Sequence, residues 1–401
     1  MPSSDCPRPV SAWIRASRID HINLAAALLR SGFMPFLALF LYKHGLGAAS
    51  IGAVMAFGNL VLMVATVPAG MVVDSRHGRK VWPVIAGGLA LGAFCILLHS
   101  HSMFASLCAV AMMSLSEAVI TPALLAMNFN IIPMYQRLDQ LGRNQAFGHL
   151  GRAAGLALAG LVGSGFGFST LIAFEGVYLM LLLATVWRAP PVSRLRVHEG
   201  RPSANRSQTL LGLSIALGLF QIGNAALSLL LGLSLADSSR LSAPALSSGI
   251  AIVAQIAMIG GSILIVPVLR RWGYWRVFAA TFAILPLRCV IATILPPHLA
   301  LVPVEILHGI GESAQMLAIG AALSELRVPA NGIGVRYGSI MLLQELGKAA
   351  SPLLACYVAE RWTTDTAYIL MAAIGAIALI FWIPYRQQMP PSVPRRRLGL
   401  V

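Results

Sequence analysis

The sequence predicts an all-α membrane protein whose twelve transmembrane helices form two similar six-helix halves. The composition, the spacing of long apolar segments and the distribution of basic residues predict this fold. Of 401 residues, 57% are hydrophobic and 11% are charged, whereas about a quarter of the residues of a soluble domain are charged. A mean hydropathy of +0.78 also excludes an ordinary globular surface.

The apolar segments have the length of membrane spans, because about 17 to 25 helical residues cross roughly 30 Å of hydrocarbon. The expected spans are 22–42, 50–73, 82–98, 103–127, 144–165, 169–187, 210–235, 245–269, 277–296, 299–322, 338–358 and 366–385. A turn is predicted at "GSGFGFS", because a single helix over 144–187 would be about 66 Å long. The apolar runs are continuous rather than alternating, which excludes a membrane β-barrel.

The basic residues predict the orientation. A formal net charge of +15 is compatible with nucleic-acid binding, but the basic residues follow the membrane topology instead. With the N-terminus inside, 22 of them lie in expected cytoplasmic segments, and the outside holds Lys43, Arg240 and Arg361. This asymmetry predicts a multi-pass protein of the inner membrane with both termini in the cytoplasm, and no nucleic-acid partner.

Several other classes of function are not expected. The N-terminal segment has no apolar core of a cleavable signal peptide. Five cysteines without a CxxC pair indicate neither a disulfide framework nor a metal site. The chain has no G-x-x-x-x-G-K-[ST] loop for nucleotide phosphates. We therefore expect no cofactor, no metal and no enzymatic activity.

The chain divides at 188–209, a polar segment with three prolines and five arginines. It separates a six-helix bundle over 1–187 from a second over 210–401, which ends in a short basic tail. Three pairs of segments recur at a shift of about 195 residues: "HLGRAAG" with "ELGKAAS", "SEAVITPALL" with "ESAQMLAIGA", and "SRHGRK" with "RRWGYWR". Parallel repeats of this kind are typical of transporters that bind a solute between the halves, near the middle of the bilayer.

The segment "GMVVDSRHGRK" resembles the loop between spans 2 and 3 of the major facilitator superfamily, G-x-x-x-D-R-x-G-R-R/K. One residue is inserted after the aspartate and Ser75 follows it, so Arg76 is expected to act as the motif arginine. In that family the loop holds neighbouring helices together when the cavity faces outward. The resemblance implies a gating loop made of Gly70, Asp74, Arg76, Gly78, Arg79 and Lys80. The alternative, a merely basic cytoplasmic loop, leaves Asp74 unexplained.

Ionisable side chains in the middle of spans are the candidate site residues, because each costs on the order of 3 kcal/mol at the bilayer centre. The resemblance implies that spans 1, 4, 7 and 10 line a central cavity and that spans 2, 5, 8 and 11 flank it. The residues expected on this translocation path are Arg30, Glu117, Arg152, Gln221, Asn224, Gln255, Glu312, Gln315 and Lys348.

The tenth span predicts a proton-coupling site. Glu305, His308, Glu312 and Gln315 fall within an arc of roughly 80° on the expected helix. A desolvated carboxylate tuned by a cation or a histidine can exchange a proton, so Glu312 and His308 are the expected coupling residues. Glu117 is the repeat equivalent of Glu312.

Fixed ion pairs are the alternative role for these charges. Glu312 would then pair with Lys348, and Glu117 with Arg152. Arg288 and Glu305 are level across the short hairpin "LPPHLA" and are expected to form a structural ion pair.

Two transport functions fit the sequence. The first is proton-coupled export of a small organic solute, although the span-5 signature of drug/proton antiporters, G-x-x-x-G-P-x-x-G-G, lacks its proline here. The second is proton-coupled uptake of an anionic solute held by Arg30, Arg152 and Lys348. A membrane enzyme or sensor would need a catalytic constellation or an added domain. The expected partners are the solute, protons and the lipid bilayer, and the chain is expected to act as a monomer.

Overall fold

The computed structural model describes residues 9–31, 37, 41, 48–75, 80–100, 102–131, 136–166, 168–188, 204–236, 243–325 and 333–388. Over these ranges the chain is helical and contains no strand. The predicted all-α class is therefore confirmed for this part of the chain.

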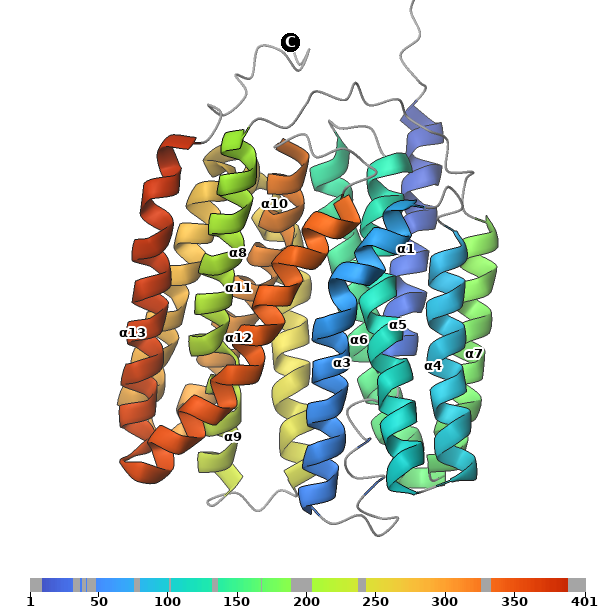
Figure 1. The fold of residues 1–401 in the computed structure, drawn as a ribbon, viewed down its shortest axis with the longest axis horizontal. Helices are drawn as coiled ribbons and strands as arrows, with labels where there is room; N and C mark the ends of the chain where they lie inside the picture. The colour runs from blue at the N-terminus through green and yellow to red at the C-terminus, as the bar shows by residue number, and fades with distance from the viewer. Residues whose placement is uncertain are drawn as a thin grey trace, which may run out of the picture.

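The helices run side by side along one direction (Figure 1). In chain order they are α1 (Pro9–Ser31), α3 (Ala48–Ser75), α4 (Val81–His99), α5 (Met103–Ile131), α6 (Arg137–Phe166), α7 (Phe168–Arg188), α8 (Ala204–Asn224), α9 (Leu227–Ala236), α10 (Ala243–Ile294), α11 (Pro297–Glu325), α12 (Ile333–Arg361) and α13 (Thr364–Trp382), followed by a 3-10 turn, η3 (Ile383–Gln388).

Seven segments of the described helices combine the length and the hydropathy of a membrane span. One of them, 251–294 in α10, has 44 residues and is about 66 Å long at 1.5 Å per residue, enough to cross twice. Gly273 breaks this helix with φ 74° and ψ 163°, a conformation that side chains disfavour. The break lies in the predicted loop "RRWGYWR", so α10 contains the expected eighth and ninth spans.

Two other predicted boundaries are informative. The turn at "GSGFGFS" is confirmed, because α6 ends at Phe166 and α7 begins at Phe168. The first helix differs from the predicted span, since α1 begins at Pro9 rather than at residue 22. Asp20, before the predicted start of the span, is fully buried and accepts hydrogen bonds from Gln140 and Arg143 of α6, so this part of α1 packs on α6.

Hydrophobic packing is organised in two large clusters. One gathers buried residues between Ile22 and Val186. The other gathers those between Leu210 and Trp382, together with Leu141. In Figure 1, helices α1 and α3 to α7 lie on one side of the molecule, and α8 to α13 lie on the other. The predicted limits of the two halves are compatible with this packing.

The two halves meet where α3 packs on α12 and α6 packs on α10. At Gly70 a Cβ atom would overlap the backbone carbonyl of Gly334. At Gly338 it would lie 2.8 Å from the carbonyl oxygen of Thr66. Both glycines thus allow the backbones of α3 and α12 to touch at the end of the bundle where α1 begins and α7 ends (Figure 1).

We predict that Gly70→Ala separates the halves at this end, because the new methyl group meets backbone atoms that cannot rotate away. Spin labels at the exposed positions Met71 and Ser339 should then report a longer distance across the α3–α12 contact. Gly88→Ala is the matched control, since a Cβ there meets no atom within 4 Å. An unchanged label distance in Gly70→Ala would contradict the close approach.

Candidate functional site

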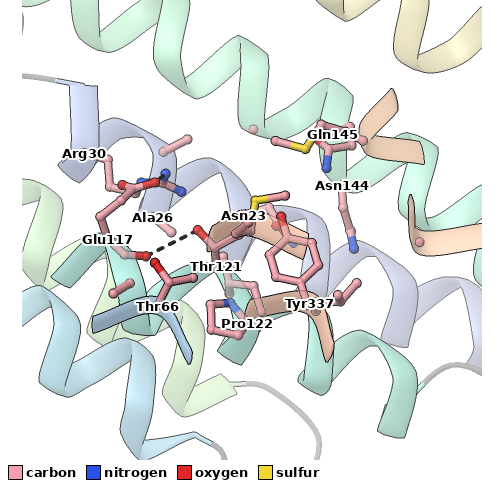
Figure 2. A pocket seen from close by; sticks show the side chains of 18 of the residues that line it. Asn23, Ala26, Arg30, Thr66, Glu117, Thr121, Pro122, Asn144, Gln145 and Tyr337 are labelled. Carbon is pink, nitrogen blue, oxygen red and sulfur yellow. Dashed lines mark hydrogen bonds and ion pairs between the residues drawn. The ribbon is translucent and has the colours of Figure 1, made fainter. Parts of the chain in front are cut away.

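A cavity of about 250 Å³ lies between the two halves. Helices α1, α3, α5 and α6 line it from one half, and α11 and α12 line it from the other. Figure 2 shows the side chains that point into it. Five of the predicted path residues are among the lining residues: Arg30, Glu117, Arg152, Glu312 and Lys348. The structure therefore brings these charges together, while their role in binding stays a prediction.

On one wall, Arg30 of α1 forms an ion pair with Glu117 of α5. Figure 2 shows the two side chains meeting at one side of the cavity. The predicted pair between Glu117 and Arg152 is therefore wrong. Counting residues along the spans gave the common depth of these groups but not the direction in which each helix presents them. That direction places Arg30, rather than Arg152, against the carboxylate.

On the opposite wall, Lys348 bonds to Glu345 of the same helix, with Nζ to Oε1 at 2.8 Å. The alternative in which Lys348 forms an ion pair with Glu312 is therefore not observed, although the two groups lie within each other's electrostatic field. Residues three apart are neighbours on one helix face, so Glu345 reaches the lysine without any contribution from tertiary packing.

Arg152 and Glu312 are the two lining charges left over from these pairs. Among the described residues, neither side chain has a hydrogen bond or an ion pair, although each lies within the electrostatic field of the other. Arg152 comes from α6 and Glu312 comes from α11, so the two groups face the cavity from different halves. Both are partly exposed to it.

Amide side chains form the end of the cavity nearest the closed contact between the halves. Asn128, Asn144 and Gln145 line this region, and Figure 2 shows Asn144 and Gln145 on the side opposite Arg30. Behind them, Asp20 accepts hydrogen bonds from Gln140 Nε2 at 2.7 Å and from Arg143 Nε at 3.1 Å. This buried network fixes the α1–α6 contact beneath the cavity.

The predicted polar stripe of the tenth span does not act as one surface. On α11, Glu312 faces the cavity together with Met316 and Gly320, whereas His308 and Gln315 are not among the lining residues. Gln315 is fully buried within the half that contains it. An arc of roughly 80° is wide enough to face both the cavity and the neighbouring helices, so the stripe is divided between them.

The expected ion pair of Arg288 and Glu305 is not formed. Both side chains are 1% exposed. Arg288 donates to the Val304 carbonyl at 3.1 Å and to Asn224 Oδ1, while Glu305 accepts from Ser228 Oγ at 2.6 Å. Arg288 thus lies inside the second half, where Asn224 at the end of α8 and the Val304 carbonyl of α11 accept its hydrogen bonds.

Besides Gln315, three further predicted path residues lie away from the cavity lining. Asn224 and Gln221 are buried and bonded to each other at 3.3 Å. Gln255 Oε1 instead lies 2.9 Å from Nδ1 of the buried His149, which connects α10 to α6 across the halves. Their positions indicate packing and contact between halves rather than direct contact with a solute.

The gating loop is described in part, since Arg76, Gly78 and Arg79 lie outside the described residues. Asp74, in the last turn of α3, accepts backbone N–H bonds from Gly334 at 3.0 Å and Val335 at 2.9 Å. These are the first free amides of α12, and a carboxylate at a helix N-terminus is favoured both as a cap and by the helix dipole. Lys80 lies in the turn before α4.

A second contact between halves lies at the same end. Asp139, in the first turn of α6, forms an ion pair with Arg270 of α10. Together with Asp74 on the N-terminus of α12, it fixes the end of the bundle at which α1 begins. We call the pair of contacts made by Asp74 and Asp139 the closed end.

Sequence reasoning missed several lining residues, of which Tyr337 and Glu345 matter most. Tyr337 lies amid the charges of Arg30, Arg152, Glu312 and Glu345, and Figure 2 shows its ring beside Asn144. A signal was available, because Tyr337, Met341, Glu345 and Lys348 recur at the spacing of one helix face. Lys348 alone would have located that face.

Comparisons with known proteins agree with this architecture. Residues 22–300 match the family model described as Major Facilitator Superfamily. Two uncharacterized MFS-type transporters from two strains of Mycobacterium tuberculosis are each 27% identical over 399 residues, which cover 94% of this chain and 94% of theirs.

Solved structures share the fold. The human organic anion transporter MFSD10 (TETRAN) is similar with a TM-score of 0.75 at 13% identity, covering 94% of this chain and 100% of its own. The transporter FucP, in its outward conformation, has a TM-score of 0.71 at 13% identity, covering 95% and 100%. A bacterial homologue of the iron transporter ferroportin, in its outward-facing state, has a TM-score of 0.71 at 14% identity, covering 92% and 98%.

We predict that Asp74→Asn weakens the closed end without unfolding the protein. Asparagine keeps one acceptor oxygen but removes the charge at the α12 N-terminus. This loss changes the ratio of the two conformations by about 2- to 30-fold. Solute flux in proteoliposomes should fall while the melting temperature stays close to that of the wild type. Asp365→Asn, at the exposed start of α13, is the control. Equal flux in Asp74→Asn and the wild type would contradict a gating role for Asp74 and would favour the alternative of a merely basic cytoplasmic loop.

We also predict that Arg30 and Glu117 depend on each other. Glu117→Gln leaves Arg30 without its partner and should lower the free energy of unfolding by about 1–3 kcal/mol. The double change Glu117→Gln with Arg30→Gln should restore most of this loss, as measured by thermal unfolding of the detergent-solubilised protein. Glu117→Gln with Arg152→Gln is the comparison. Restoration by Arg152→Gln instead of Arg30→Gln would contradict the pairing.

Proposed function

Because the chain belongs to the major facilitator superfamily, we propose that it is a secondary transporter that exports a small organic solute in exchange for protons. The observation that carries this proposal is the cavity between the halves, into which Arg152 and Glu312 project without an ion pair or a hydrogen bond to any described residue. A transport site needs groups that are free to bind the solute or a proton in one conformation and to release it in the other. Arg152 and Glu312 meet that need.

Alternating access is the proposed mechanism. The halves 1–187 and 210–401 would rock about the cavity, with 188–209 as the connection. The contacts of Asp74 and Asp139 close one end, so the structure supports a state whose cavity opens toward the other end. Transport then requires these contacts to break and re-form, which a few hydrogen bonds at helix ends permit.

Glu312 is the proposed proton-coupling residue. Glu117, its repeat equivalent, is occupied by an ion pair with Arg30 of the same half. The Glu312 carboxylate has no such partner among the described residues, and it faces the cavity that carries the solute. A carboxylate that binds either a proton or the solute couples their movements in opposite directions.

The size of the cavity limits the solute. Pockets for drug-sized ligands measure about 300–1,000 Å³, and this one measures about 250 Å³. Three cations and three carboxylates among its lining residues, together with several amides, favour a polar compound. We therefore propose a small polar metabolite rather than a bulky apolar drug.

Uptake of an anionic solute is the second candidate, and Arg152 favours it as a cation without an ion-pair partner. One similar structure is a human organic anion transporter, although 13% identity carries only the fold. In this case Glu312 would take up a proton when the solute binds, and the proton and the solute would move in the same direction. The sign of the proton gradient that drives accumulation distinguishes the two functions.

The proposed setting is the inner membrane, with both termini in the cytoplasm and the monomer as the working unit. The excess of basic residues in the expected cytoplasmic segments supports the orientation. With that orientation, the closed end faces the cytoplasm.

We predict that Glu312→Gln abolishes proton-driven accumulation but retains exchange at saturating solute. The amide cannot release a proton, while the cavity keeps its shape and its other polar groups. The measurement is solute flux in proteoliposomes with and without a pH gradient. Glu360→Gln, at an exposed position of α12, is the matched control. Proton-driven accumulation in Glu312→Gln would remove this residue from the coupling mechanism.

A further inference from the structure

We propose that the solute carried in this cavity is a zwitterion, whose anionic group binds Arg152 and whose cationic group binds Glu312. This inference rests on the proposed transport function and names the class of its solute. It follows from which charges of the cavity are already neutralised and from the half to which each remaining charge belongs.

Each half neutralises one pair of lining charges by itself. Arg30 and Glu117 both belong to the first half, and Lys348 and Glu345 both belong to α12 of the second. These pairs can move with their own half as rigid units. Relative motion of the halves therefore does not separate them, and a solute does not need to compensate them.

The remaining charges are divided between the halves. The Arg152 guanidinium is presented by α6, and the Glu312 carboxylate is presented by α11. Among the described residues neither group forms an ion pair, although Glu312 lies within the electrostatic field of Arg152 and of Lys348. When the cavity closes around a solute, both groups lose contact with water, and an uncompensated charge in that setting is strongly unfavourable. A solute with a carboxylate and an ammonium group compensates both charges and connects the two halves.

Solutes of other charge compensate only part of this arrangement. A monocation binds Glu312 and is repelled by Arg152. A neutral polyol can bond to the amides of Asn144 and Gln145 but makes no charged contact with Arg152 or Glu312. A monoanion satisfies Arg152 and needs a proton on Glu312, so its binding would strengthen as the pH falls. A zwitterion alone satisfies both groups while Glu312 is ionised.

Tyr337 adds a second reason for a compound with two charges. It lines the same cavity and lies within the electrostatic field of both Arg152 and Glu312. A solute bound beside the ring would place its apolar body against the ring and direct its two charged ends toward Arg152 and Glu312.

The test uses matched trios that share one carbon skeleton and differ in charge. The probes are leucine with isocaproate and isoamylamine, phenylalanine with hydrocinnamate and phenethylamine, and γ-aminobutyrate with butyrate and propylamine. Binding to the purified full-length protein in lipid nanodiscs is measured at neutral and acidic pH. In at least one trio the zwitterion should bind about 10- to 100-fold more tightly than both analogues, since each analogue lacks one charge-assisted contact.

Two variants assign the ends of the solute. Glu312→Gln should abolish the preference for the zwitterion over the acid analogue, and Arg152→Gln should abolish its preference over the amine analogue. Glu360→Gln should retain both preferences. The order of affinities within a trio is measured on the wild-type protein. It therefore still tests the inference if Glu312→Gln or Arg152→Gln fails to fold.

Three outcomes would overturn the inference. They are equal binding within every trio, tightest binding of an amine, and tightest binding of an acid that strengthens at low pH. The third would support the anion-uptake alternative. Flux of any of these probes driven by a pH gradient would keep the proposed transport function even where the zwitterion fails. Absence of gradient-driven flux for all probes in proteoliposomes would instead count against the transport function itself.

Discussion

The need to neutralise charge inside an apolar bundle governs this structure. An ionisable group in mid-membrane costs on the order of 3 kcal/mol when it is left alone, and this chain places several at one depth. Most have local partners: Arg30 pairs with Glu117, Lys348 pairs with Glu345, and Arg288 bonds to Asn224 of α8 and the Val304 carbonyl of α11. The bonds of Arg30 and Arg288 join different helices of one half, so separating those helices would expose an unpaired charge.

The contact between the halves is built differently from the interior of each half. Inside a half, helices are held mainly by extended apolar packing. Between the halves, Asp74 accepts two amide bonds at the start of α12, and Gly70 allows the backbones to touch. Hydrogen bonds at a helix end contribute about 0.5–2 kcal/mol, which is small compared with the packing of either half. An interface of this kind can break and re-form without loss of the fold, as alternating access requires.

The sequence predicted the helices and the depth of the charged residues, because hydropathy and residue counting report position along the membrane normal. The turn at "GSGFGFS" and the break in "RRWGYWR" follow from length and from glycine. The partners of Glu117 and Glu312 could not be predicted, since they depend on how each helix is rotated about its own axis. Helical periodicity does not show which part of a polar arc faces the cavity. On α11 one arc contacts both the cavity and the packed interior, and it contains Glu305, His308, Glu312 and Gln315. Tyr337 and Glu345 were within reach, because they share a helix face with Lys348.

The repeat explains why, within the described part of the chain, one cavity charge of each sign has no ion-pair partner. Glu117 and Arg152 of the first half correspond to Glu312 and Lys348 of the second, so each half carries a carboxylate and a cation at equivalent positions. One additional charge in each half alters this symmetry. Arg30 binds the carboxylate of the first half and leaves Arg152, whereas Glu345 binds the cation of the second half and leaves Glu312. Because the additions have opposite signs, a symmetric scaffold presents a cation from one side and a carboxylate from the other. A cavity of that kind favours a solute with two ends of opposite charge.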